Sequence, residues 1–256
     1  YEQAISCFDK ALSLRPDYAE AWSNKGNSLN ELKYYDKAIA CYDTALSINP
    51  NIEWVIGDLL HAKMKMCSWS EFAITLEEVS RKIVANKKAI QPFSLLALNE
   101  DLSLHKKSSE IYAQYKFPSK DDLGNIAKHP RGKKIRIGYF SADFHNHATG
   151  YLLAELIELH DKKQFETIGI SFGSSQSDVM RTRLEKSFDE FIDASAMSDI
   201  EIAQLSRKLK IDIAVDLKGF TQNCRTGIFT YRAAPLQVSY LGYPGTMAAD
   251  YVDYLI

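Results

Sequence analysis

The sequence predicts an α-helical region followed by an α/β region. Two observations indicate this. The first 50 residues carry one pattern twice at a spacing of 34 residues, which is typical of a helical repeat. From Lys134 onward, short apolar runs alternate with amphipathic stretches, which predicts a parallel sheet with helices on both faces. We expect repeats over 1–90, a helical connector over 91–132 and the α/β region over 133–256.

The 34-residue pattern has the signature of a tetratricopeptide repeat. Four positions of one unit return in the next as the same or a closely similar residue type: Ala4 and Ala38, Phe8 and Tyr42, Ala11 and Ala45, Pro16 and Pro50. The complete unit adds Trp22, Gly26 and Leu29 in its first helix. Small residues at Gly26 and Ala38 let two antiparallel helices approach closely, and Pro50 ends the second helix.

After Pro50 the repeat pattern decays, as expected where a helical array is capped. Helical spacing continues in four further stretches: Trp54–Lys65, Ser70–Lys87, Pro92–Leu98 and Leu102–Tyr115. Two segments are expected to be loops because of their Pro, Gly and Lys content: Phe117–Lys120 and Lys128–Lys134.

In the α/β region, six strands and three helices are expected. The strands are Ile135–Phe140, Phe165–Phe172, Phe191–Asp193, Ile211–Leu217, Leu236–Leu241 and Tyr251–Ile256. The helices are Gly150–His160, Gln176–Lys186 and Asp199–Leu209. No G-x-G-x-x-G run follows the first strand, so a standard dinucleotide site is not expected. Ligands of such sheets bind at the carboxyl ends of the strands. The loops of interest are therefore Ser141–Thr149, Lys218–Cys224 and Gly242–Thr246.

The first of these loops carries Asp143, His145 and His147 just before a helix N-terminus. A neutral histidine accepts a proton near physiological pH, and a helix N-terminus favours anionic oxygens. The alternative is that Asp143 or Asn146 caps the turn while the histidines are solvated. The spacing alone is weak support for a metal site, and none is expected.

The second and third loops combine polar side chains with glycines. Asp216 lies in an apolar strand, which is costly unless it is paired or functional, and Lys218 is a candidate partner. Thr221 has the chemistry to hydrogen-bond a sugar hydroxyl or to cap a glycine turn at Gly219. The third loop reads Gly242-Tyr243-Pro244-Gly245, which either approaches a ligand closely or merely turns tightly.

Taken together, the three loops resemble one protein family. The segments KIRIGYFSADFHNHAT (134–149), DLKGFT (216–221) and APLQVSYLGYPGT (234–246), behind tetratricopeptide repeats, are similar to the first catalytic lobe of the O-linked N-acetylglucosamine transferases. The SPINDLY-type O-fucosyltransferases share this lobe. The resemblance implies two Rossmann-like lobes of the GT-B type, inversion at the sugar, no catalytic metal and no cofactor besides a nucleotide-sugar donor.

The resemblance also implies roles for residues. His147 matches the family's active-site histidine, a general base or a positioning residue, and Asp216 is expected to be catalytic with it. Thr221 matches a residue near the sugar. Lys218 and Gly219 are expected to contact substrate, as are the four residues Gly242, Tyr243, Pro244 and Gly245. The donor-binding second lobe is expected to lie outside this sequence, so the fragment alone is expected to be inactive.

Three functions remain open at this point. The first is transfer of N-acetylglucosamine from UDP-GlcNAc to Ser or Thr of proteins held by the repeat groove. The others are GDP-fucose-dependent transfer and a non-catalytic adaptor. The net charge of −2 argues against a broadly basic nucleic-acid surface. Without a visible signal peptide, an 18-residue apolar run or a zinc-type spacing of its four cysteines, the chain is expected to be cytoplasmic and not membrane-bound.

Overall fold

The computed structural model describes residues 1–126, 132–173 and 177–256, and it divides into two compact units. Unit 1 is Tyr1–Tyr112 and unit 2 is Ala113–Ile256. Part of the expected loop Lys128–Lys134 and the expected helix start at Gln176 lie outside the described residues. The bounds expected for the repeats, the connector and the α/β region remain predictions.

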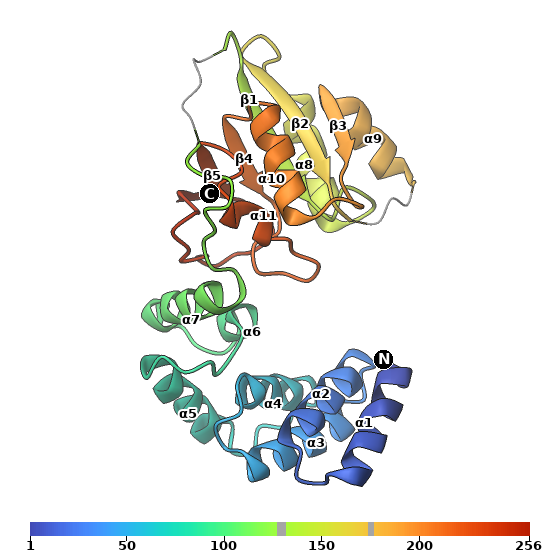
Figure 1. Cartoon of the computed structure of the whole chain (residues 1–256), viewed down its shortest axis with the longest axis vertical. Helices are drawn as coiled ribbons and strands as arrows, with labels where there is room; N and C mark the ends of the chain where they lie inside the picture. The colour runs from blue at the N-terminus through green and yellow to red at the C-terminus, as the bar shows by residue number, and fades with distance from the viewer. Residues whose placement is uncertain (127–131, 174–176) are drawn as a thin grey trace. The chain divides into compact units, whose positions relative to one another are not determined.

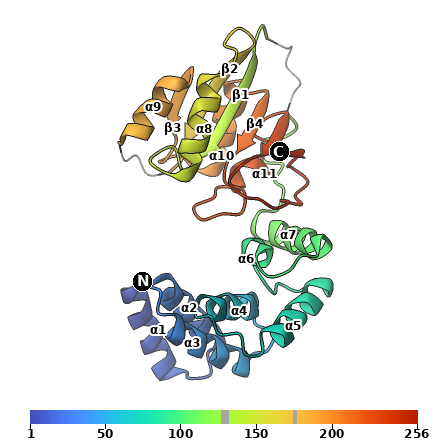
Figure 2. The same cartoon turned by 180° about the vertical axis from the view of Figure 1, so that it is seen from behind.

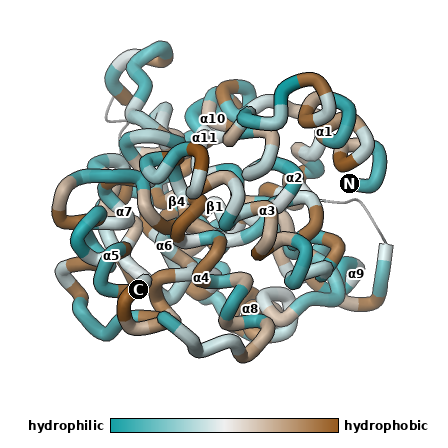
Figure 3. Tube along the Cα trace, turned by 90° about the horizontal axis from the view of Figure 1, so that it is seen from below, coloured by the Kyte–Doolittle hydropathy of each residue, from teal (hydrophilic) through white to brown (hydrophobic). Residues whose placement is uncertain are grey.

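Unit 1 is built from helices, as expected from the repeat (Figure 1). They are α1 (Glu2–Leu14), α2 (Ala19–Glu31), α3 (Tyr35–Ile48), α4 (Val55–Lys65), α5 (Phe72–Val84), α6 (Pro92–Leu96) and the first part of α7 (Leu102–Lys116). Hydrophobic and hydrophilic stretches alternate along α1 in Figure 3, as in an amphipathic helix. The chain turns after Leu14 and after Ile48, where Pro16 and Pro50 follow.

The close approach of α2 and α3 depends on Gly26. A Cβ at this position would lie 2.6 Å from Cε1 of Tyr42, so the ring occupies the space that a side chain would need. Tyr42 is fully buried, and its hydroxyl donates to Oδ1 of Asn27 at 2.9 Å. The close approach of the two helices that was expected at Gly26 is therefore confirmed.

Unit 2 contains a six-stranded parallel sheet in the order β3-β2-β1-β4-β5-β6, of which Figure 2 labels β1 to β4. The strands are β1 (Ile135–Ser141), β2 (Phe165–Ser171), β3 (Glu190–Asp193), β4 (Ile213–Asp216), β5 (Leu236–Ser239) and β6 (Tyr254–Leu255). The helices are α8 (Ala148–Glu158), α9 (Val179–Ser187), α10 (Asp199–Lys208) and the short α11 (Gly227–Thr230). The short helix α11 was not expected from the sequence, and β6 is shorter than the expected strand Tyr251–Ile256.

Two hydrophobic clusters cover the two faces of this sheet. Ile137 and Tyr139 of β1 join side chains of α8 and α9 in one cluster. Phe140 joins side chains of α10 and α11 in the other. This alternation follows from the period of two along a strand, and it explains why β1 carries apolar side chains on both of its faces.

The segment from Phe117 to Gly124 is tied to unit 2 by hydrogen bonds. Tyr251 donates its hydroxyl to the carbonyl of Phe117 at 3.0 Å, and Arg207 donates to the carbonyls of Leu123 and Gly124 at 2.7 and 3.0 Å. These residues precede the first strand and were expected to be connector. Within the described ranges, no helix is both long and apolar enough to cross a bilayer.

Replacing Gly26 by alanine should lower the free energy of unfolding by about 1–3 kcal/mol. The added methyl group would overlap the Tyr42 ring, and this outweighs the better helix propensity of alanine. Urea denaturation followed by circular dichroism measures the change. In a Tyr42→Leu background the same substitution should cost less. If the costs of the two single substitutions instead add up to that of the double variant within about 0.5 kcal/mol, the contact between Gly26 and Tyr42 is contradicted.

Candidate functional site

The strand order brings the three expected loops together. β1, β4 and β5 are consecutive neighbours in the sheet and run in the same direction. The loops that follow them therefore leave the same edge side by side, which is where ligands of such sheets bind. The predicted site residues thus lie on three adjacent loops of unit 2.

In the first loop, the backbone turns twice before α8 begins. The amide of His145 donates to the carbonyl of Asp143 at 2.8 Å, and that of His147 to the carbonyl of His145 at 2.7 Å. His147 is the N-cap of α8, and its Nδ1 accepts from the amide of Thr149 at 3.2 Å. Since Nδ1 acts as an acceptor, the neutral ring carries its proton on Nε2. The ring is 43% exposed and available to a ligand.

A buried ion pair joins the first loop to the second. Nζ of Lys218 lies 2.5 Å from Oδ2 of Asp143, and the two side chains are only 7% and 9% exposed. The same Asp143 oxygen is 3.7 Å from Nδ1 of His147. The pair therefore places a fixed positive charge and a fixed negative charge directly beside the histidine.

Asp216, at the end of β4, has a different environment from the one expected. Its Oδ1 accepts from the backbone amide of Lys218 at 2.9 Å, while its Oδ2 is buried with no partner in the described part of the chain. The expectation that the Lys218 side chain would pair with Asp216 is wrong, because that ammonium group binds Asp143. Burial raises the pKa of Asp216 to about 6, although hydrogen bonds from the backbone of Lys218 and Gly219 oppose the shift.

The second and third loops pack against each other through two glycines. Gly219 has φ +54°, and a Cβ there would overlap Cβ of Tyr243. A Cβ at Gly242 would overlap the carbonyl oxygen of Leu217. Leu241 has φ +71°, a strained conformation for a bulky residue. These glycines are thus required by the contact between the loops, whether or not a ligand approaches them.

The remaining predicted residues surround this contact. Tyr243 is 2% exposed, and its ring lies 5.5 Å from that of Phe220. Pro244 is exposed and Gly245 is buried. Thr221 donates its hydroxyl to the carbonyl of Lys218 at 2.9 Å, so it closes the glycine turn and can still accept a hydrogen bond from a ligand.

A fourth loop, between β2 and α9, supports the first one. Asp178 caps α9: its Oδ1 accepts from the amide of Arg181 and its Oδ2 from the amide of Asn146, each at 2.7 Å. Asp178 therefore fixes the backbone next to His147. Asp178 was not among the expected site residues, although an aspartate just before a helix is a recognisable capping signal.

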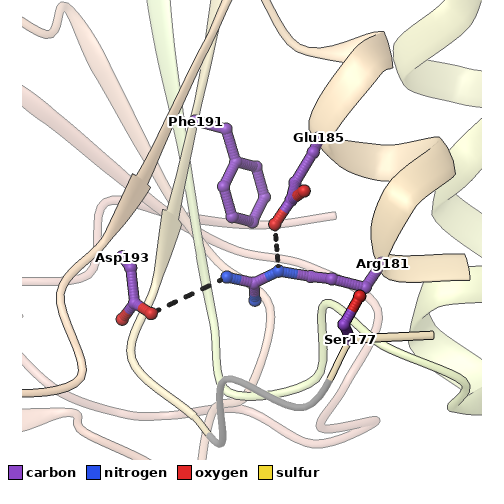
Figure 4. Close-up of a pocket in the computed structure, with 5 residues that line it drawn as sticks. All are labelled: Ser177, Arg181, Glu185, Phe191 and Asp193. Atoms are coloured by element: carbon purple, nitrogen blue, oxygen red, sulfur yellow. Dashed lines mark hydrogen bonds and ion pairs between the residues drawn. The ribbon is translucent and has the colours of Figure 1, made fainter.

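Beside this loop lies a cavity of about 400 Å³ (Figure 4). Arg181 crosses it, stacked 4.4 Å from the ring of Phe191. Its guanidinium donates to Glu185 and to Ser171, each at 2.6 Å, and lies 4.0 Å from Asp193. The cation is thus already bound by the protein. In the described ranges, no group of three or more His, Cys, Asp or Glu side chains is arranged to hold a metal ion.

In sequence, the chain is thus a set of tetratricopeptide repeats followed by a Rossmann-like lobe. At the carboxyl ends of its strands, this lobe carries His147 beside the Asp143–Lys218 ion pair. The sequence pattern of glycosyl transferase family 41 matches residues 75–256, and tetratricopeptide patterns match 1–18 and 19–52. The chain belongs to glycosyl transferase family 41.

Relatives with known names agree with this family. The chain is 33% identical over 213 residues to a probable UDP-N-acetylglucosamine–peptide N-acetylglucosaminyltransferase, SEC, of Arabidopsis thaliana, covering 77% of this chain and 22% of that protein. A Caenorhabditis elegans protein named UDP-N-acetylglucosamine–peptide N-acetylglucosaminyltransferase is 33% identical over 126 residues, which cover 49% of this chain and 11% of that protein. The chain thus spans about a fifth or less of these relatives.

Among solved structures, a mutant O-GlcNAc transferase of Thermobaculum terrenum superimposes with a TM-score of 0.65. The match covers 98% of this chain and 49% of that one at 24% identity, so it supports the fold alone.

Replacing Lys218 by methionine should destabilise unit 2 by about 3–5 kcal/mol, because Asp143 would stay buried without its counter-ion. The double variant Asp143→Asn/Lys218→Met should recover part of this loss. Arg183→Met is a matched control: it breaks the exposed pair with Glu158 and should cost less than about 1 kcal/mol. Chemical denaturation of the three variants measures this, and equal costs for Lys218→Met and Arg183→Met would refute the role of burial.

Asp216 should make stability depend on pH. Its pKa is raised from 3.8 to about 6 in the folded state, so the folded chain binds more protons than the unfolded chain between these values. The contribution of Asp216 to the free energy of unfolding is therefore fully present below about pH 4, and it is lost as the pH rises to about 6. Asp216→Asn mimics the protonated form. Relative to wild type, this variant should gain about 3 kcal/mol in unfolding free energy between pH 4 and 6.5. A difference that does not change with pH would contradict this assignment.

Proposed function

We propose that the full-length protein containing this chain transfers N-acetylglucosamine from UDP-GlcNAc to Ser or Thr hydroxyls of other proteins. The observation that carries the proposal is the arrangement of His147, the Asp143–Lys218 pair and Thr221 on adjacent loops of a family 41 chain. The names of the relatives supply the sugar and the acceptor class.

In the proposed reaction, the acceptor oxygen attacks the anomeric carbon as the bond to the diphosphate oxygen breaks with inversion. The hydroxyl proton leaves to a base or to water, and UDP departs with the bonding electrons. Positioning of the two reactants and stabilisation of the departing charge supply most of the acceleration. No metal and no further cofactor enter this proposal, in keeping with the resemblance noted above.

The geometry gives His147 the role of a donor. Because Nδ1 accepts the amide of Thr149, the proton on Nε2 of the neutral ring is free to bind an oxygen of the substrate. This favours positioning over proton abstraction by that ring. Lys218 contributes positive charge beside it, and Asp216 holds the backbone amide of Lys218 in place.

The second and third loops complete the proposed substrate site. Gly219 and Thr221 supply backbone and an accepting hydroxyl, and residues 242–245 form the adjoining wall. The proposed GT-B architecture places this lobe on the acceptor side. The protein acceptors would be held by the repeats, and we propose a cytoplasmic setting for the transfer.

The test uses the full-length protein, a cell lysate as acceptor and labelled UDP-GlcNAc, with labelled GDP-fucose in parallel. His147→Asn keeps an N-cap residue but removes the imidazole, so the helix should remain folded. Its transfer rate should fall by roughly 100-fold or more. Thr221→Val should also lower it, whereas Lys163→Ala, an exposed change in the turn before β2, should not.

Each possible outcome is informative. Incorporation of N-acetylglucosamine that is lost in His147→Asn supports the proposal. Incorporation of fucose alone would show that the donor is GDP-fucose and not UDP-GlcNAc. A folded protein that uses neither donor would indicate an adaptor.

A further inference from the structure

An aromatic residue of the connector reaches the second loop of the proposed site. Phe117 directly follows α7, and its ring is stacked on that of Phe220, with the ring centroids 6.2 Å apart and the planes 8° from parallel. Phe220 is only 6% exposed and lies between Gly219 and Thr221 of the site. Its ring also lies 5.5 Å from that of Tyr243 in the third loop. The three rings thus connect the segment before β1 to both glycine-containing loops.

The backbone that carries Phe117 is held in place by other parts of unit 2. The carbonyl of Phe117 accepts from the hydroxyl of Tyr251 at 3.0 Å. Further along, the amide of Lys120 donates to the carbonyl of Thr230 at 2.9 Å, and its Nζ donates to the hydroxyl of Tyr231 at 3.0 Å. The ring of Phe117 therefore belongs to a fixed backbone, so it can act as a support for the second loop.

The turn around Phe220 needs such support because a glycine precedes this residue. Gly219 has φ +54°, a conformation that glycine adopts without strain, and glycine also leaves the backbone free to adopt others. Two hydrogen bonds of the turn are local: Thr221 donates its hydroxyl to the carbonyl of Lys218, and the amide of Lys218 donates to Asp216, each at 2.9 Å. The packing of the Phe220 ring fixes the turn relative to distant parts of the chain, which these local bonds do not do.

We propose that Phe117 is a positioning residue for the transfer reaction. Its ring fixes Phe220, and thereby the backbone of the turn and the hydroxyl of Thr221, which the proposed function places at the substrate. This role rests on the proposed function, whereas the contact between the rings does not. Since the transfer depends on the placement of its reactants, a small displacement of this turn slows it. The connector is then part of the support of the site.

The first measurement is amide hydrogen exchange of the full chain, with no donor or acceptor present. In Phe117→Ala, the amides of Lys218 and Cys224 should exchange roughly tenfold or more faster than in wild type. The amide of Lys218 donates to Asp216 and that of Cys224 to the carbonyl of Thr221, so both report on the turn. Phe117→Tyr keeps the ring and should exchange like wild type.

Leu123→Ala is the matched control. Leu123 belongs to the same connector segment and packs, like Phe117, against the hydrophobic cluster around Phe140. Its carbonyl is bound by Arg207 near the end of α10, the helix that leads into the start of β4, so Leu123 lies toward the opposite edge of the sheet from the site. Truncating Leu123 should lower the stability of unit 2 and leave the exchange of both turn amides unchanged. Thermal melting of both variants, with exchange measured well below both midpoints, separates loss of positioning from global unfolding.

The second measurement is transfer by the full-length protein. In Phe117→Ala, kcat should fall by roughly tenfold or more while KM for UDP-GlcNAc changes less, because an interaction that positions the reactants acts mainly on kcat. Phe117→Tyr should restore kcat, and Leu123→Ala should leave it near the wild-type value.

Three results would overturn the positioning role: equal exchange in Phe117→Ala and Leu123→Ala, faster exchange with unchanged kcat, or a loss of kcat that Phe117→Tyr does not restore. If the wild-type protein transfers no sugar, the proposed function fails, and the exchange experiment still decides whether Phe117 orders the turn.

Discussion

Parallel pairing of β1 with both β2 and β4 is the constraint on which unit 2 depends. A parallel strand pair needs a crossover connection, so each strand is followed by a segment that must cover one face of the sheet. The two clusters around Tyr139 and Phe140 result from this, one on each face. The carboxyl ends of the strands then lie at the same edge, and the loops that follow β1, β4 and β5 meet there. The proposed site lies at this edge for that reason.

Two buried carboxylates of unit 2 are stabilised in different ways. Asp143 has a lysine counter-ion from a neighbouring loop. Asp216 has backbone amide donors at one oxygen, none at the other, and a raised pKa. In the first case a counter-ion supplied by the fold fixes the charge, and in the second burial partly suppresses it.

The loops of the site are held by contacts that do not involve substrate. Gly219 and Gly242 are required by the packing of one loop on another, and Asp178 holds the backbone beside His147 from a fourth loop. Preorganisation of this kind is what the proposed transfer needs, because that reaction depends mainly on positioning. Membership of glycosyl transferase family 41 is consistent with such a site.

The sequence by itself determined the repeat, the alternation of strands and helices, and the three loops, because each has a local or periodic signal. It did not determine the partner of Lys218, since Asp143 lies 75 residues away and the strand order alone brings the two together. The proton position on His147 likewise depends on the start of α8. The segment from Phe117 to Gly124 has no periodic signal, and its place in unit 2 is fixed by bonds to Tyr251 and Arg207. These features were decided only by the tertiary structure, because contacts between distant residues leave no pattern in the local sequence.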